Sequence, residues 1–142
     1  MAEARLRTYL AYLLTEAERG VNRGLAEALA AEHVTVEQWR ILQALSDGYG
    51  HSMRDLAGAV LMPHPTLTKA VDRLIDDALA YRRQDETDRR RVAVFLADRG
   101  AALLRRLDRH VEGHHRAVEA AYGAQRTERL MRELERLVES LD

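Results

Sequence analysis

Arginine side chains are concentrated in one short segment of the chain, DETDRRR at residues 85–91. An arginine held on a rigid two-stranded hairpin can enter the minor groove of DNA, where the narrow walls concentrate negative potential. Asp88 lies two residues before Arg90, so its carboxylate could pair with that guanidinium and hold it in one orientation. A charged hairpin can equally serve only to prevent sheet edges from aggregating. The segment alone therefore leaves two functions open, DNA contact or an inert polar turn.

A second set of polar side chains lies on one side of a predicted helix that ends near Leu79. Its apolar residues gather on one side at helical angles, and these are Leu67, Val71, Leu74, Ile75 and Ala78. On or near the opposite side lie Thr66, Lys69 and Arg73, with Thr68 at the border. Hydroxyls and cations can bond to base edges and phosphates. Three acids share the exposed side and would repel DNA, Asp72, Asp76 and Asp77, so an ordinary solvated helix face is the alternative.

Histidines could provide a metal site, although the chain has no cysteine to help them. His110 and His114 are four residues apart on a predicted helix, with His115 adjoining, and that spacing could supply two ligands. A site would need further ligands from another segment, such as His33 or a carboxylate. Packing or surface exposure is the more common role of such a pair, so we expect no metal and no other cofactor.

The sequence contains no motif that predicts catalysis. It has no serine in a nucleophile-elbow pattern, no phosphate-binding loop and no cysteine nucleophile. The lack of cysteine also excludes disulfides and thiol-based redox sensing, and it fits a reducing compartment. We therefore expect a binding protein rather than an enzyme.

Length and composition predict one helix-rich domain. The chain has 142 residues, of which 46% are hydrophobic and 32% charged. Its net charge is -1, so nucleic-acid binding would depend on where the cations are placed. No apolar run approaches the roughly 20 residues that span a membrane, and the N-terminus has no secretory pattern. We expect a cytoplasmic protein without membrane contact.

Helical periodicity predicts the long elements that flank the charged segments. A first helix is expected from about Glu3 to Ala31, and Gly20 and Gly24 interrupt it, either as a tolerated weakness or to let another backbone come close. A fifth helix begins near Asp98. In a last helix, at 127–142, the leucines recur at the spacing of a helix that packs on another helix, namely Leu130, Leu134, Leu137 and Leu141.

Shorter elements are expected in the centre of the chain. The second helix follows a capping-box pattern, Thr35 with Gln38, and ends at the turn 47–50. The third has Ser52 as its N-cap, and its apolar residues are Leu56, Val60 and Leu61. Pro65 suits the first turn of the fourth helix. The runs YRRQ and RVAVFLA then predict two strands, joined by DETDRR as a hairpin loop.

The order helix, turn, short helix, turn, helix and hairpin is that of a winged helix-turn-helix. Residues 52–100 resemble the MarR family of winged-helix transcriptional regulators. The family's wing pattern is an aspartate, any residue, an arginine, five residues and then leucine-threonine. It reads here as Asp88-Arg89-Arg90, RVAVF and Leu96-Ala97. PTLTKAVDRLIDDALAYRR, upstream, is similar to the family's recognition helix and first wing strand, and the outer helices match its dimerisation helices.

The resemblance implies a mainly α fold with a small β-hairpin wing. Residues 34–97 would form the winged helix-turn-helix domain, and residues 1–33 with 98–142 the helical dimerisation region. The expected partners are double-stranded DNA and a second copy of the chain, because the family binds pseudo-palindromic operators as homodimers, more commonly as repressors. The two recognition helices would lie about 34–36 Å apart, one helical turn of DNA.

The resemblance also assigns residues and exposes two departures. It implies that the major groove and adjacent backbone are contacted by Thr66, Thr68, Lys69 and Arg73, and the minor groove by Arg90 with Arg89 or Arg91, while Asp88 orients the wing. Ala97 replaces the threonine that would cap the fifth helix, and Asp98 is expected to take over. Ala78 stands where many members have a glycine. Because a left-handed alanine costs on the order of 1 kcal/mol, we expect this helix to end differently.

Control by a small molecule is a further implication. Many members of the family release DNA when a small aromatic or anionic molecule binds between the dimer helices and the winged domain. Candidate lining residues are Tyr9, Tyr12, His33, Trp39 and His114, all of which could instead be core or interface residues. Some members are zinc sensors, so a metal-responsive regulator is an alternative. A dimeric helical protein-interaction module without DNA binding is another, although its wing would be uncharged.

Overall fold

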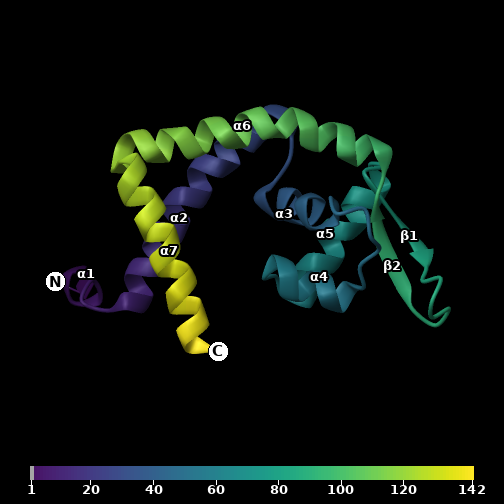
Figure 1. The fold of residues 1–142 in the computed structure, drawn as a ribbon, viewed down its shortest axis with the longest axis horizontal. Helices are drawn as coiled ribbons and strands as arrows, with labels where there is room; N and C mark the ends of the chain where they lie inside the picture. The colour runs from purple at the N-terminus through teal and green to yellow at the C-terminus, as the bar shows by residue number, and fades with distance from the viewer. Residues whose placement is uncertain (1) are drawn as a thin grey trace. The chain divides into compact units, whose positions relative to one another are not determined.

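Helices form most of the structure, a computed structural model that describes residues 2–142 (Figure 1). In chain order they are α1 (Ala2–Leu6), α2 (Leu10–Leu29), the 3-10 helix η1 (Ala30–Glu32), α3 (Val36–Leu45), α4 (Met53–Val60), α5 (His64–Asp76), α6 (Asp98–Tyr122) and α7 (Ala124–Leu141). The strands β1 (Ala80–Gln84) and β2 (Val92–Leu96) pair antiparallel between α5 and α6. The predicted fold class is confirmed, because the structure is mainly α with one β-hairpin between α5 and α6.

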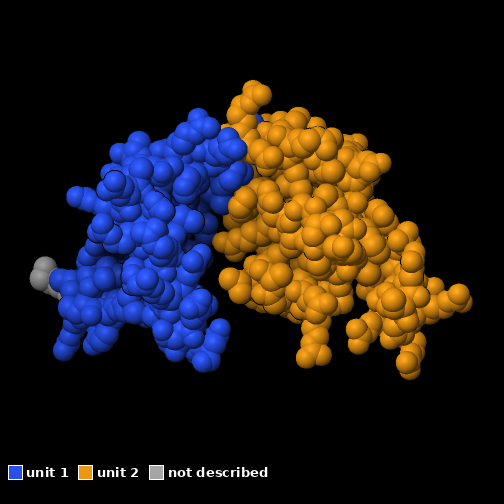
Figure 2. All heavy atoms as spheres, in the orientation of Figure 1, with its two compact units in different colours: residues 1–28, 110–142 blue, residues 29–109 orange. Residues whose placement is uncertain are grey.

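The chain forms two compact units (Figure 2). One consists of residues 1–28 and 110–142 and contains α1, α7, nearly all of α2 and the C-terminal part of α6. The other consists of residues 29–109 and contains α3, α4, α5, the hairpin and the start of α6. The arginine-rich hairpin and the polar face of α5 therefore belong to the same unit.

Side-chain caps define where the short helices of residues 29–109 begin. The Thr35 hydroxyl accepts the Gln38 N–H at 3.1 Å, and the Gln38 side-chain oxygen accepts the Thr35 N–H at 3.0 Å, which completes the predicted capping box. Ser52 accepts the Asp55 N–H at 3.1 Å. A cap of this kind stabilises a helix by about 1 kcal/mol. Pro65 lies in the first turn of α5, where its missing N–H is not needed.

Residues 29–109 share one apolar core, to which α5 contributes its inner face. The buried side chains are Leu29, Val34, Ile41, Leu42, Leu45, Leu56, Val60, Met62, Leu67, Val71, Leu74, Ala80, Ala93, Val94, Leu103, Leu104 and Leu107. Burial of one leucine, isoleucine or valine contributes about 1.5–3 kcal/mol. Because Leu67, Val71 and Leu74 are completely buried, the rotation of α5 about its axis is fixed and its polar side faces solvent.

The hairpin is attached to the unit at its base. The backbone of His51 bonds twice to Val94 of β2, at 2.9 and 2.8 Å, which adds a bridge to the two-stranded sheet. Tyr81 stacks on Phe95 with ring centroids 5.4 Å apart. A Cβ atom at Gly50 would collide with the Phe95 ring, so glycine suits this position. These contacts hold the base of the wing, while its tip extends beyond them.

In the unit of residues 1–28 and 110–142, Gly24 allows a close approach. A Cβ atom there would lie 2.8 Å from Cε1 of the His114 ring, whereas one at Gly20 would meet nothing within 4 Å. Neither glycine breaks α2. Many apolar side chains of this unit remain exposed in a single chain, including Leu10, Leu13, Leu14, Leu130, Met131, Leu134, Val138 and Leu141. None of the helices described is both long enough and apolar enough to cross a membrane.

The predicted first helix is wrong in one respect, because it is not continuous from Glu3 to Ala31. It breaks between α1 and α2, where the Thr8 N–H and hydroxyl both donate to the Arg5 carbonyl, at 3.2 and 2.7 Å. A threonine side chain that competes for a backbone carbonyl in this way interrupts the regular helical ladder. At the C-terminal end of α2, the predicted α-helix is replaced by the short 3-10 helix η1.

Three helix ends also differ from the predictions. Leu61 is outside α4, has a left-handed φ of 58° and is 83% exposed. The fourth helix stops at Asp76 rather than near Leu79. Ala78 takes the left-handed conformation, with φ 60°, and the Leu79 N–H bonds to the Leu74 carbonyl at 2.8 Å. This is the Schellman ending that glycine usually makes, so the expected different ending is wrong. Asp98 is the first residue of α6 and not the residue before it.

Candidate DNA interface

The outer face of α5 carries the predicted major-groove residues. Thr66, Lys69 and Arg73 are exposed, and Thr68 is half-buried. The Thr68 hydroxyl donates to the His64 carbonyl at 2.9 Å, so its proton is already used within the helix. His64 is also exposed, in the first turn of α5, and was not among the predicted residues. The N-terminal residues of a recognition helix contact base edges, so position in the helix was the available signal.

An open groove of about 620 Å³ runs beside this face, between α5 and the start of α3. It is lined by His33, Thr35, Glu37, Gln38, Thr66, Lys69, Ala70, Arg73 and Asp77. The polar residues of α5 are therefore reachable from solvent along the length of the helix. Acids and bases both contribute to the groove, so its charge is mixed.

The hairpin tip is organised by its two aspartates. The Asp88 carboxylate accepts the Arg90 N–H at 3.0 Å and lies 3.5 Å from the Arg90 Nε and 3.7 Å from the Arg91 Nε. The expected pairing of Asp88 with Arg90 is thus present. Asp85 accepts the Thr87 N–H at 3.0 Å and its hydroxyl at 2.8 Å, and these hydrogen bonds lower the pKa of the Asp85 carboxyl. Asp85 therefore stays ionised at neutral pH and well below it.

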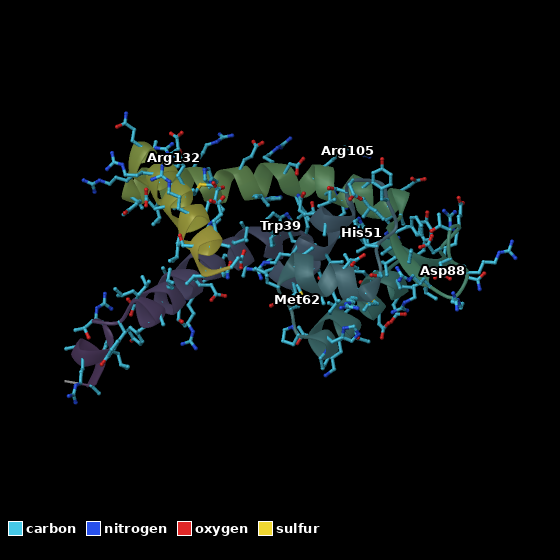
Figure 3. All side chains as sticks on the ribbon, turned by 60° about the horizontal axis from the view of Figure 1, so that its bottom comes forward. Trp39, His51, Met62, Asp88, Arg105 and Arg132 are labelled. Atoms are coloured by element: carbon cyan, nitrogen blue, oxygen red, sulfur yellow. The ribbon has the colours of Figure 1, made fainter. Side chains whose placement is uncertain are left out.

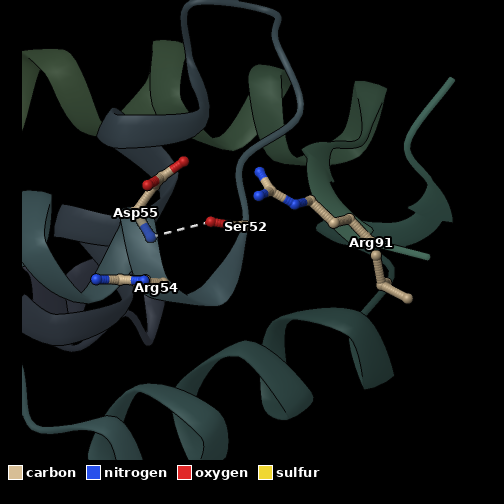
Figure 4. Close-up of a pocket in the computed structure, with 5 residues that line it drawn as sticks. Ser52, Arg54, Asp55 and Arg91 are labelled. Carbon is tan, nitrogen blue, oxygen red and sulfur yellow. Dashed lines mark hydrogen bonds between the residues drawn. The ribbon is translucent and has the colours of Figure 1, made fainter. Parts of the chain in front are cut away.

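The three arginines of the tip differ in surroundings. The Arg90 side chain is 93% exposed, and Asp88 beside it lies toward the free end of the hairpin (Figure 3). Arg91 instead turns toward the start of α4, where it lines a groove of about 670 Å³ with Ser52, Arg54, Asp55 and Val92 (Figure 4). Arg89 is exposed. Arg54, a further cation at this groove, was missed because its sequence neighbours do not connect it to the wing.

One acid of the α5 face is neutralised by the wing. The Arg82 Nη2 atom, on β1, donates to the Asp72 Oδ1 atom at 2.7 Å. Within residues 2–142, neither Asp76 nor Asp77 forms an ion pair. Arg83, the next residue of β1, lies with its guanidinium carbon 4.6 Å from the centre of the Phe95 ring. The repulsion expected from three acids is therefore reduced at one of them.

The five candidate effector residues are divided between the two units. Tyr9, Tyr12 and His114 belong to residues 1–28 and 110–142, and His33 and Trp39 belong to residues 29–109. Tyr9 and His33 are exposed, and the other three are half-buried. The Trp39 Nε1 and His114 Nε2 atoms are buried without a hydrogen-bond partner among the residues described. Buried polar atoms usually have partners, so each is a group that a bound molecule could satisfy.

The histidines of α6 do not form a metal-binding cluster with other residues that the structure describes. Across residues 2–142, no three histidine, aspartate or glutamate side chains are placed to share an ion. His115 lies 3.5 Å from Glu119 on the same helix, and His114 packs on Gly24.

Several known proteins are similar to this chain in sequence or in structure. The MarR family model matches residues 34–91. The homoprotocatechuate degradative operon repressor of Escherichia coli is 29% identical over 106 residues, which are 75% of this chain and 72% of the relative. The solved structure of the repressor CouR bound to a 23-mer DNA duplex has a TM-score of 0.85 at 24% identity and covers 94% of both chains. The structure of NadR in complex with 4-hydroxyphenylacetate has a TM-score of 0.72 at 27% identity and covers 87% of this chain and 88% of NadR.

The matches fall on the elements that the wing pattern predicted and on the helices around them. The matched residues contain α3, α4, α5 and the hairpin up to Arg91, and the structural likeness extends over the outer helices. The relatives are transcriptional regulators, in agreement with the expectation that the chain is not an enzyme. Residues 34–91 therefore match the MarR family, and the chain as a whole has the winged helix-turn-helix fold of solved transcriptional regulators such as CouR.

Proposed function

We propose that this regulator is a repressor that binds a pseudo-palindromic operator as a homodimer and leaves it when a small molecule binds. In this proposal α5 enters the major groove, and the tip of the wing enters the minor groove. Residues 34–97 contact DNA, and residues 1–33 with 98–142 join the two copies. The proposed activity takes place in the cytoplasm and needs no cofactor.

The observation that carries the proposal is the pairing of Asp88 with Arg90 at the free end of a hairpin whose base is fixed. The carboxylate fixes the Arg90 backbone through the N–H and lies 3.5 Å from its Nε, so an ordered turn presents a side chain that is free to enter a groove. Lys69 and Arg73 lie on the exposed face of α5 in the same unit. Three consecutive arginines, Arg89 to Arg91, all exposed at this tip, are what the minor groove would attract.

Binding as a dimer is supported by the apolar side chains that a single copy exposes. In residues 1–28 and 110–142 they follow α2 and α7 at helical spacing. A second copy would cover such stripes and would double the DNA contacts of one wing and one helix.

We propose an aromatic acid as the molecule that releases DNA. The support is chemical: NadR was solved with 4-hydroxyphenylacetate, an aromatic anion. Among the residues that the structure describes, the ring nitrogens Trp39 Nε1 and His114 Nε2 are buried without a partner. A phenol or carboxylate oxygen could accept a hydrogen bond from either nitrogen, and Tyr9, Tyr12 and His33 are further candidates for contact. None of these residues needs a metal ion for such binding.

A titration tests both parts of the proposal. A fluorescently labelled duplex from the region upstream of the protein's own gene is mixed with increasing protein, and its anisotropy is measured with and without 4-hydroxyphenylacetate and related hydroxybenzoates. We expect saturable binding that weakens steeply with salt, and release by at least one of these acids. Salt-insensitive binding would contradict the DNA interface, and retention of DNA with every acid tested would contradict the proposed effector class.

A further inference from the structure

The ion pair between α5 and the wing strand joins the two elements proposed to contact DNA. Asp72 projects from the exposed side of α5 and retains 53% of its side-chain exposure, whereas Arg82 on β1 retains 39%. The bond between them is short, at 2.7 Å. Exposed ion pairs of this kind contribute little to folding, typically about 0–1 kcal/mol. A role other than stability is therefore the better explanation of a pair placed at this surface.

The wing does not need this pair to keep its position. Its base is held on another side by the His51–Val94 bridge and by the Phe95 ring, which lies against Gly50. The start of β1 is fixed by the backbone bond from Leu79 to Leu74, which closes the end of α5. Since the strand is anchored without Arg82, the Asp72–Arg82 ion pair would add little to the attachment of the wing.

Electrostatics give the pair a clearer use. Asp72 lies three residues after Lys69 and directly before Arg73, so its carboxylate is among the cations of the α5 face. Asp76 and Asp77 lie at the C-terminal end of the helix, farther from the N-terminal residues that read base edges. An unpaired carboxylate repels an approaching phosphate most strongly where the two come closest. Asp72 is the acid nearest the N-terminal end of α5, and it is the one that Arg82 neutralises.

We infer that Arg82 is a positioning residue that cancels the charge of Asp72, so that a phosphate backbone can approach α5, and that Arg82 itself does not contact DNA. This inference rests on the proposed DNA binding. It gives two arginines of the hairpin different roles. Arg82 acts within the protein, and Arg90 at the tip acts on DNA.

The test is a double-mutant cycle with Arg82→Gln, Asp72→Asn and the double variant. Affinity for a labelled mixed-sequence duplex is measured by anisotropy at low salt, where binding does not require a known operator. With Asp72 present, we expect Arg82→Gln to weaken binding about tenfold, because one uncompensated negative charge is left facing the phosphates. Asp72→Asn should bind as wild type does, or more tightly. When Arg82→Gln is added to Asp72→Asn, affinity should change by less than about threefold.

Arg83→Gln is the matched control, because it removes the same charge from the neighbouring residue of β1 without touching Asp72. Its effect, whatever its size, should be equal with and without the Asp72→Asn substitution, since the two sites share no contact. Thermal melts of all variants confirm that each one is folded. The Arg82→Gln effect should shrink as salt rises, because screening weakens the repulsion.

Three results would overturn the inference. Equal losses from Arg82→Gln with and without Asp72→Asn would show that Arg82 contacts DNA directly. Equal losses of DNA affinity in Asp72→Asn, Arg82→Gln and the double variant would show that the ion pair only holds the wing in place. Unchanged affinity in all variants would show an inert surface pair. If wild type itself fails to bind any duplex at low salt, the proposed DNA-binding function fails, and that result is distinct from the three others.

Discussion

At the scale of single residues, the wing tip depends on Asp88. Its carboxylate holds the backbone of Arg90 by a 3.0 Å hydrogen bond and faces the guanidinium groups of Arg90 and Arg91. A negative group so close to an arginine that is proposed to contact DNA reduces the local positive charge. Asp88 must therefore favour DNA binding by ordering the backbone of the turn, so that Arg90 projects from it.

Two substitutions of Asp88 separate order from charge. Asp88→Asn keeps an oxygen that can accept the Arg90 N–H but loses the charge, whereas Asp88→Ala loses both. A hydrogen bond of this kind is worth about 1 kcal/mol, so Asp88→Ala should bind DNA about fivefold more weakly than Asp88→Asn. Anisotropy titrations of the two variants measure the difference. Tighter binding by Asp88→Ala than by Asp88→Asn would mean that the hydrogen bond of Asp88 does not support affinity.

Residue pairs that are close in sequence could be predicted, and distant ones could not. Asp88 and Arg90 are two residues apart in one turn, so their pairing follows from the sequence alone. Asp72 and Arg82 are ten residues apart on different elements, and their contact depends on the direction in which β1 leaves α5. The sequence therefore showed three repelling acids on α5 without any sign that one of them is neutralised.

At the scale of elements, the exposed face of α5 is set by both its inner face and its C-terminal end. The inner face is fixed by buried leucine and valine, and the end by the left-handed Ala78. The sequence predicted the caps Thr35 and Ser52 correctly because a cap is a local contact. It failed at Thr8, Leu61 and Ala78, where the conformation is one that the residue type disfavours or where a side chain competes with the backbone.

Replacement of Ala78 by glycine tests the strain at the end of α5. Glycine adopts a φ of 60° without steric cost, so Ala78→Gly should stabilise the protein by up to about 1 kcal/mol. Ala59→Gly is the control, since Ala59 is an exposed residue inside α4, where glycine should destabilise by about 1 kcal/mol. Urea denaturation measures both free energies of unfolding. A loss of stability in Ala78→Gly comparable to that of Ala59→Gly would contradict a left-handed Ala78.

At the scale of the whole molecule, DNA binding and dimerisation are proposed to use different parts of the sequence. The proposed DNA contacts lie in residues 29–109, and the exposed apolar stripes on α2 and α7 lie in the other unit. Both DNA half-sites must be occupied for high affinity, so a change on α7 should reach DNA binding through the loss of the second copy.

Leu134→Glu tests that dependence. Leu134 is one of the exposed apolar residues of α7, and a buried unpaired charge in an interface is strongly unfavourable. We expect light scattering to show a monomer for Leu134→Glu at concentrations where wild type is a dimer, together with a loss of at least about tenfold in affinity for DNA. Glu139→Lys, on another side of α7, should remain a dimer. A dimeric Leu134→Glu would mean that this stripe is not the interface.

The most direct test of the proposed wing contact is the DNA affinity of Arg90→Ala. Arg105→Ala is its control, because Arg105 is an exposed arginine on α6 and its removal changes the net charge equally. On the duplex from the protein's own upstream region, we expect Arg90→Ala to weaken binding by at least about tenfold and to lower the salt slope by about one phosphate contact. Arg105→Ala should stay within about twofold of wild type. An unchanged affinity for a folded, dimeric Arg90→Ala would contradict the proposed wing contact.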